Sequence, residues 1–261
     1  MTVYGNNSIR MLPALARNDL RARYSGSLLG VLWAFVLPWT TLMVFWYVFQ
    51  QGFHNAPVRG APYILWFSAA YVPWIFFADL VTSGCSCLLE YSFLVKKVCF
   101  NIYLLPAVKV LSALFVHMFF IGFLFIMLLF YGYSFSPVYL QVFYYSFSAA
   151  VLGLGLSWLL SPLTVFFKDM GSICNMLLQI GFWATPILWS TDALEKGQTA
   201  RVLALNPMYY VTQGYRDCLL SQKLFWHTPL AAVKFWTVTA AVGTVGRMIF
   251  SRLQPHLADE V

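Results

Sequence analysis

Apolar residues are gathered into long runs along the chain instead of alternating with polar residues. The first charge-free run extends from Val31 to Phe49. About 20 consecutive apolar residues suffice for an α-helix to cross a bilayer. This criterion predicts six crossing helices, at about residues 31–51, 61–84, 106–132, 138–162, 170–189 and 229–250. No hydrophilic stretch is long enough for another domain, so we expect residues 1–261 to form a single transmembrane domain, with spans one to five within about 31–189.

A basic segment, residues 8–30, directly precedes the first apolar run. Its apolar positions fall on one face of a helix: Ile9, Leu12, Ala16 and Leu20. The polar flank and the approach to the membrane consist of Arg17, Arg21, Arg23 and Tyr24. Such a pattern predicts an amphipathic helix that lies on the membrane surface. The helix fits two roles, a plain topogenic anchor or a docking surface for a cytoplasmic partner.

The composition agrees with a membrane protein. Of the 261 residues, 61% are hydrophobic and 10% are charged, and the mean hydropathy is +0.72. A soluble domain carries about 25% charged residues, so this chain has too little polar surface to cover a soluble globule. The net charge of +7 then belongs to basic loops facing the cytoplasm and anionic lipid. We therefore expect membrane lipids, and not nucleic acid, as partners.

The basic residues are divided unequally between the two sides of the predicted bundle. With the N-terminus inside, the cytoplasmic side holds Arg10, Arg17, Arg21, Arg23, Lys96, Lys97, Lys109, Lys168, Arg247 and Arg252. The outer side holds Arg59, Lys196, Arg201, Arg216, Lys223 and Lys234. This excess follows the positive-inside rule, and an even number of crossings agrees with it. We therefore expect both termini in the cytoplasm.

Two connecting segments show residue patterns that are typical of short helices. Within residues 85–105, Ser86–Val98 fits either a short amphipathic helix ending in two lysines or a solvated loop. Within residues 190–228, Asn206 is suited to cap a helix that has Pro207 at its first position. Apolar residues follow at helical spacing: Met208, Val211, Tyr215 and Leu219. The outer segment is thus expected to form two short helices that dip into the outer interface.

The sequence offers little for catalysis. It contains no Gly-rich loop ending in Gly-Lys-Ser/Thr, so we expect no ATP hydrolysis by this chain. The cysteines and histidines are not spaced as metal ligands or as a catalytic group, and we expect no catalytic residue, metal or cofactor. Asp79, in the second span, marks either a transport pathway or a pairing with a nearby lysine. Trp33, Trp46 and Tyr47 fit either an interfacial aromatic belt or a conduit wall on which sugar rings stack.

Four short motifs occur in order along nearly the whole chain. They are Arg17–Trp33 followed by Pro38, Leu94–Phe100 followed by Leu105–Pro106, Thr164–Met170 followed by Thr185–Leu188, and Asn206–Met208 followed by Tyr215–Asp217. Together they resemble the permease subunits of ABC-2 type polysaccharide exporters, which move O-antigen, capsule and teichoic-acid chains. The sequence departs from the family pattern at Lys168, where arginine is usual, and at Asn101–Ile102, where Pro-Arg is usual.

The resemblance implies an all-α integral membrane fold. It has six transmembrane helices, an N-terminal amphipathic interface helix, a cytoplasmic coupling helix and re-entrant outer gate helices. The implied ATPase-coupling residues are Glu90, Leu94, Val95, Lys96 and Lys97. The implied outer-gate residues are Asn206, Pro207, Tyr215, Arg216 and Asp217. For Arg216 and Asp217 we expect pairing with each other, locally or across a dimer.

The resemblance also implies a function, as the non-hydrolytic permease of an ATP-dependent translocase in a prokaryotic plasma (inner) membrane. A homodimer of permeases would assemble with two ATP-binding cassette subunits, which bind ATP and Mg²⁺, and would move a lipid-linked, O-antigen-like polysaccharide. The alternative is an ABC-2 exporter of capsule, teichoic acid, a drug or a small lipid. An embedded enzyme needs clustered acids or histidines, and an ion-coupled carrier needs several buried charges; the sequence favours neither.

The predicted topology can be tested by labelling single cysteines in a cysteine-free background. An impermeant maleimide added outside the cell should modify Gly197→Cys and spare Lys97→Cys until the membrane is permeabilised. The two positions lie in the segments assigned to opposite sides. The reverse labelling pattern would contradict the assignment of both ends to the cytoplasm.

Overall fold

The computed structural model describes residues 3–52, 57–96, 101–190, 203 and 205–260. Within them all regular structure is helical, apart from one isolated bridge between Val58 and Ala61. The helices are α1 (Val3–Arg23), α2 (Trp33–Trp46), α3 (Tyr63–Glu90), α4 (Ser92–Val95), α5 (Leu105–Phe130), α6 (Gln141–Phe166), α7 (Met170–Ala184), α9 (Pro207–Leu219) and α10 (Pro229–Glu260). Short helical turns cover Gly30–Leu32, Tyr47–Gly52, Ile102–Leu104, Pro137–Leu140 and Phe225–His227. The all-α prediction is confirmed for the described residues.

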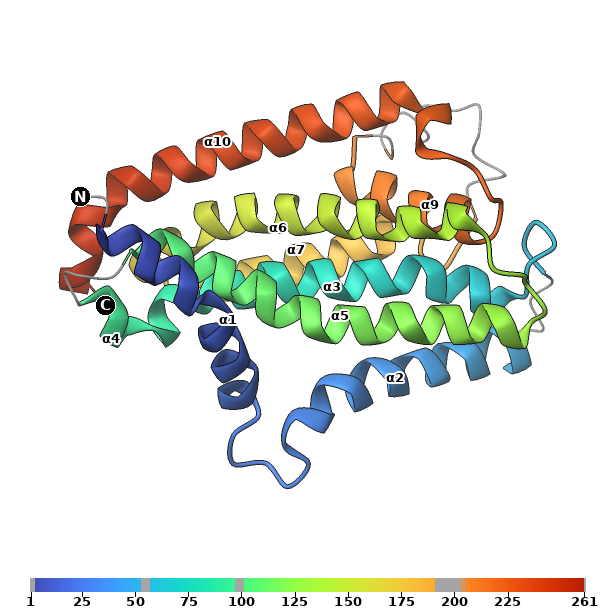
Figure 1. Ribbon diagram of the computed structural model, residues 1–261, viewed down its shortest axis with the longest axis horizontal. Coiled ribbons are helices and arrows are strands. Elements are labelled where there is room, and N and C mark those ends of the chain that lie inside the picture. Colours follow the sequence, from blue (N-terminus) through green and yellow to red (C-terminus); the bar gives the residue numbers. More distant parts are fainter. Residues whose placement is uncertain (1–2, 53–56, 97–100, 191–202, 204, 261) are drawn as a thin grey trace.

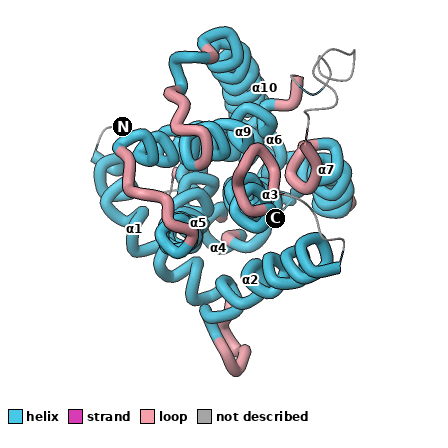
Figure 2. The backbone as a smooth tube through the Cα atoms, turned by 90° about the vertical axis from the view of Figure 1, so that its right-hand side faces the viewer, coloured by secondary structure: helices cyan, strands magenta, loops and turns pink. Residues whose placement is uncertain are grey.

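The central helix of the bundle is α3 (Figures 1 and 2). It packs against α5, α6, α7 and α9, while α10 packs along α6. Apolar side chains surround α3 on every side, so it can be buried on all faces. Its apolar window is 83% buried, whereas that of Gly30–Gly52, which includes α2, is 11% buried. The α2 helix therefore lies at the edge of the bundle, with most of its side chains outside the packed core.

Within the described residues, four helical segments are long and apolar enough to cross a membrane. They are Gly30–Gly52, Tyr63–Glu90, Ile102–Phe130 and Pro137–Phe166, and they coincide with the first four predicted crossings. The fifth predicted crossing corresponds to α7, which is apolar but has 15 residues. The sixth corresponds to α10, whose 32 residues include Lys234 and Arg247 and which extends along the molecule (Figure 1).

The amphipathic helix before the first crossing is present, with different bounds from the predicted 8–30. It is α1, and it ends at Arg23. Beyond it the chain turns through Gly26 and Gly30, whose φ angles of +86° and +52° favour glycine. Figure 1 shows α1 at the end of the bundle that also holds both termini. There it packs against α5.

Glycines allow α6 and α10 to approach closely. A Cβ atom built on Gly246 of α10 would lie 2.5 Å from the carbonyl oxygen of Gly155 on α6. A Cβ on Gly155 would in turn lie 3.1 Å from the Cα of Gly243. Small residues at such positions let helix backbones touch, which is how helices associate where burial from water no longer drives packing.

Gly246→Ala should therefore force α10 away from α6. We expect it to lower the free energy of unfolding by about 1–3 kcal/mol, as for other overpacked sites. Gly243→Ala is the matched control, because a Cβ at that position on the same helix would meet no atom within 4 Å. Thermal unfolding of the purified variants in detergent provides the measurement. Equal loss of stability in both variants would show that glycine flexibility, and not close packing, matters here.

Candidate functional site

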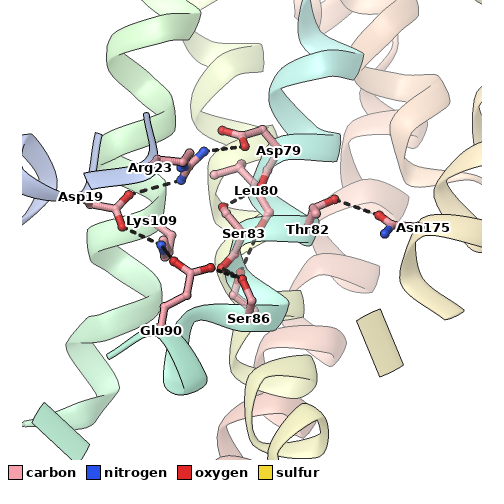
Figure 3. Close-up of polar contacts among 11 residues, drawn as sticks. Asp19, Arg23, Asp79, Leu80, Thr82, Ser83, Ser86, Glu90, Lys109 and Asn175 are labelled. Carbon is pink, nitrogen blue, oxygen red and sulfur yellow. Dashed lines mark hydrogen bonds and ion pairs between the residues drawn. The ribbon is translucent and has the colours of Figure 1, made fainter. Parts of the chain in front are cut away.

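A cluster of five charged side chains joins three helices near the end of the bundle that holds the termini. Figure 3 shows Asp19 and Arg23 from α1, Asp79 and Glu90 from α3, and Lys109 from α5. Arg23 binds Asp79 at 2.7 Å and Asp19 at 3.2 Å. The Lys109 ammonium lies 2.5 Å from a carboxylate oxygen of Asp19 and 2.5 Å from one of Glu90. The charges therefore alternate along a continuous path from Asp79 to Glu90.

The centre of this cluster is withdrawn from water. The side chains of Lys109 and Asp19 are 1% and 4% exposed, and a buried charge is tolerated only when it is paired and hydrogen-bonded. Tyr91 stabilises both of these charges. Its hydroxyl donates a hydrogen bond to Asp19 at 2.9 Å, and the centre of its ring lies 5.2 Å from the Lys109 ammonium. Ser86 donates to Glu90 at the exposed end of the path.

The local sequence explains how the cluster assembles. Asp19 and Arg23 are four residues apart on α1, so they lie on the same face of that helix.

Burial alone would raise the pKa of Asp19, but the hydrogen-bonded Lys109 ammonium and Arg23 outweigh this effect, and the pKa lies below its ordinary 3.8. Burial would lower the pKa of Arg23, but Asp79 and Asp19 outweigh it, and the pKa is raised. Both groups are thus charged at neutral pH.

The predicted interface residues are divided between this cluster and the surface. Arg17 and Arg21 are exposed on α1. Arg23 enters the cluster, and Tyr24 follows it at the wall of a cavity of about 150 Å³ between α1, α2, α3 and α5. Trp33, one of the three predicted conduit aromatics, also lines this cavity.

Asp79 was predicted to mark a pathway or to pair with a lysine. In the structure its carboxylate pairs with Arg23 of α1, so the predicted pairing is confirmed and the predicted partner, a lysine, is wrong. Of the other predicted conduit aromatics, Trp46 is half-buried against the core of the bundle, and Tyr47 is 67% exposed.

The predicted coupling helix is shorter than expected. Its first residues belong to α3, and only Ser92–Val95 forms a separate helix, α4. Val95 is buried among residues of this chain and Leu94 packs beside it, so neither presents a free apolar face. Phe93 is 57% exposed, and Lys96 is exposed as well. The remaining predicted coupling residue, Lys97, lies outside the described residues.

The predicted helix start at Asn206–Pro207 is confirmed. The Asn206 side chain accepts a hydrogen bond from the backbone N–H of Met208 at 3.0 Å, and Pro207 is the first residue of α9. The Asn206 amide also donates to the Thr185 hydroxyl at 2.8 Å. This bond ties the start of α9 to the end of α7.

Arg216 is held inside the bundle by backbone oxygens. Its guanidinium donates to the carbonyls of Trp66 at 3.1 Å, Pro186 at 2.5 Å and Ile187 at 2.8 Å. It also lies 3.4 Å from the centre of the Trp66 ring. Three elements, α9, α3 and the segment after α7, are thereby fastened together.

The local pairing predicted for Arg216 and Asp217 is wrong. The Asp217 carboxylate accepts a hydrogen bond from Gln213 at 3.0 Å, while the Arg216 donors go to carbonyls. Consecutive residues on a helix point in different directions. The three carbonyls that bind Arg216 lie on the side of α9 from which the Arg216 side chain projects. The neighbouring Tyr215 is fully buried, with its hydroxyl 2.6 Å from Ser146 Oγ and 3.0 Å from His117 Nε2.

Breaking the ionic cluster at its centre should destabilise the protein strongly. Lys109→Met leaves Asp19 buried without its main counter-charge, and we expect a loss of about 3–5 kcal/mol in the free energy of unfolding. The double variant Asp19→Asn/Lys109→Met should recover part of this loss, because the unpaired charge is removed. Unfolding in detergent is the measurement, with the exposed Lys96→Met as control. Simple additivity of the two single changes would contradict a direct pair.

Comparison with known proteins places these features in a family. Residues 11–220 match the family described as ABC-2 type transporter. The chain is 30% identical to the "O-antigen export system permease protein RfbA" of Myxococcus xanthus, over 96% of this chain and 95% of that protein. Two proteins of the same name from Klebsiella pneumoniae are 24% and 22% identical, each over 95% of this chain and 94% of theirs. The chain therefore belongs to the ABC-2 type transporter family.

Proposed function

We propose that this chain is the membrane-spanning permease of an ATP-driven exporter that moves a lipid-linked, O-antigen-like polysaccharide across a prokaryotic inner membrane. The observation that carries the proposal is the near-complete overlap with three relatives named as O-antigen export permeases. The order of the four sequence motifs supports the same assignment.

The proposed topology has six crossings with both termini in the cytoplasm. In it, α7 with the residues after it forms the fifth crossing, and α10 forms the sixth. Helix α10 extends along the bundle beside α6, which supports its role as a crossing (Figure 1). The grouping of α1, α4 and both termini at one end of the bundle supports a shared cytoplasmic side.

The proposed assembly contains two copies of this chain and two ATP-binding subunits, which bind ATP and Mg²⁺. A continuous apolar stripe on α7 supports a second copy, since few side chains of the described residues cover it. Its exposed residues are Ile173, Met176, Leu177, Ile180 and Trp183. Symmetric pairing would cover such a face and enclose a wider conduit than one chain can.

The ionic cluster supplies the proposed route of coupling. Helix α4 begins two residues after Glu90, so a push on α4 from an ATP-binding subunit displaces the Glu90 carboxylate. Glu90 is linked through Lys109 to Asp19, and Arg23 links Asp19 to Asp79. The surface helix α1 and the interior of α3 would then move together, at the end of the bundle where a lipid-linked substrate enters from the cytoplasmic leaflet.

The outer end of the bundle is proposed to form the gate. Helix α9 is fixed there by Arg216 and by Asn206. These bonds join it to the N-terminal end of α3 and the C-terminal end of α7. Opening the gate would then require α9 to move with both elements, or to break bonds from a buried guanidinium, which is costly.

The proposal is tested by reconstituting the chain with its ATP-binding partner subunit. Phe93→Asp should abolish assembly or reduce transport-linked ATPase activity about tenfold or more, because it places a charge on the exposed apolar side chain of α4. Phe135→Asp is the control, since Phe135 is 67% exposed in the connection between α5 and α6 on the opposite side.

Export is followed by detecting the polysaccharide at the cell surface in a strain that lacks the chromosomal copy. Restoration by the wild-type chain and by Phe135→Asp, but not by Phe93→Asp, is the expected result. Restored assembly and export by Phe93→Asp would place the coupling surface elsewhere. Export of a drug or lipid without any polysaccharide would overturn the proposed substrate class.

A further inference from the structure

A pocket of about 740 Å³ opens between α9 and the N-terminal half of α10. Its volume is in the range of small-molecule sites. Its floor is firmly built, because Tyr210 stacks on Phe235 of α10 at 5.0 Å between ring centres and donates to or accepts from Tyr144 of α6 at 3.1 Å. Gly214 completes the floor by letting the Tyr145 ring lie against the backbone of α9.

The wall formed by α9 is polar and aromatic. Most side chains of this helix are buried, but Tyr209, Gln213 and Asp217 remain partly exposed and line the pocket. Their spacing of four residues places them in one row along the helix. Gln213 donates to one oxygen of Asp217 at 3.0 Å, which fixes the carboxylate and leaves its other oxygen and the amide oxygen of Gln213 as acceptors.

The wall formed by α10 has a different character. Leu230 and Val233 are exposed apolar residues, and Lys234 beside them is an exposed donor. Among the described residues, neither Lys234 nor Asp217 takes part in an ion pair with another side chain. The pocket thus presents one acceptor charge and one donor charge on opposite walls.

We propose that this pocket binds a pyranose ring of the exported glycan at the outer end of the permease. The inference rests on the proposed function for the identity of the glycan, and on the pocket itself for the sugar chemistry. A pyranose has hydroxyls that donate to Asp217 and accept from Lys234. It also has a C–H face that packs on the aromatic ring of Tyr209.

The charges of the pocket disfavour other occupants. An acyl or isoprenoid chain would cover Asp217 and Lys234 without giving either a partner, which is costly. A simple anion that Lys234 attracts is repelled by Asp217, and a simple cation that Asp217 attracts is repelled by Lys234, so neither ion gains from both walls. A neutral molecule rich in hydroxyls satisfies both walls at once.

The test uses the full chain in lipid nanodiscs and a panel of methyl pyranosides of glucose, galactose, mannose, rhamnose and N-acetylglucosamine. Saturation-transfer NMR reports both binding and the ring protons that contact the protein. At least one pyranoside should bind, with the strongest transfer to protons on one C–H face. Tyr209→Ala and Asp217→Asn should each weaken its binding about tenfold, because each removes one recognition element.

Matched controls lie outside the pocket. Tyr131→Ala removes an exposed tyrosine at the end of α5, and Asp169→Asn changes an exposed acid before α7; both should bind as the wild type does. If Tyr209→Ala unfolds early, Tyr209→Leu keeps an apolar side chain of substantial volume while removing the aromatic ring and its hydroxyl.

Three results would overturn the inference. They are absence of transfer to every pyranoside, equal binding by pocket and control variants, and dissociation of a dimer by Asp217→Asn without any sugar binding, which would assign the pocket to a second copy of the chain. Sugar binding that depends on Tyr209 and Asp217 would uphold the pocket even if reconstituted export failed, so the two proposals are separable.

Discussion

The need to pair a buried ammonium at Lys109 organises one whole end of this molecule. Its side chain is 1% exposed, in a bundle whose surroundings offer little water. Charges in such a place persist only when groups from neighbouring elements pair with them or hydrogen-bond to them. Because the partners of Lys109 come from α1 and from the end of α3, the same requirement holds α1 against the bundle and fixes the start of the segment that leads to α4.

The opposite end meets the same constraint in another way. Arg216 is 3% exposed, yet its partners are three backbone carbonyls and an aromatic ring instead of carboxylates. Two of these carbonyls, those of Pro186 and Ile187, follow the end of α7 and have no hydrogen-bond donor within that helix. The guanidinium therefore supplies hydrogen bonds that the membrane could not. Between these two polar ends, apolar side chains and close glycine contacts hold the helices together, and at Gly246 and Gly155 the backbones of α10 and α6 themselves meet.

These physical origins explain what the sequence could and could not predict. Long apolar runs predicted the first four crossings, because length and hydrophobicity alone decide them, and Asn206–Pro207 predicted the start of α9 through local geometry. The pair of Asp19 and Lys109 joins residues 90 positions apart, so no local pattern announces it. The available signal was a lysine within an apolar helix together with Asp19 and Arg23 at helical spacing. The partners of Arg216 include backbone carbonyls, which every residue has, so the amino-acid sequence does not indicate which of them bind the guanidinium.

The neighbouring residues Arg216 and Asp217 show how one short helix can serve two purposes. The buried side of α9 carries Arg216 and Tyr215 and fastens the helix to α3, to α5 and α6, and to the segment after α7. The other side carries the row of Tyr209, Gln213 and Asp217 and borders a pocket. A row that binds the exported glycan, as we propose, needs a rigid support, because side chains ordered only on binding would lose affinity through entropy. The carbonyl cage around Arg216 supplies that rigidity, so fastening the helix and presenting its polar row are two results of the same set of bonds.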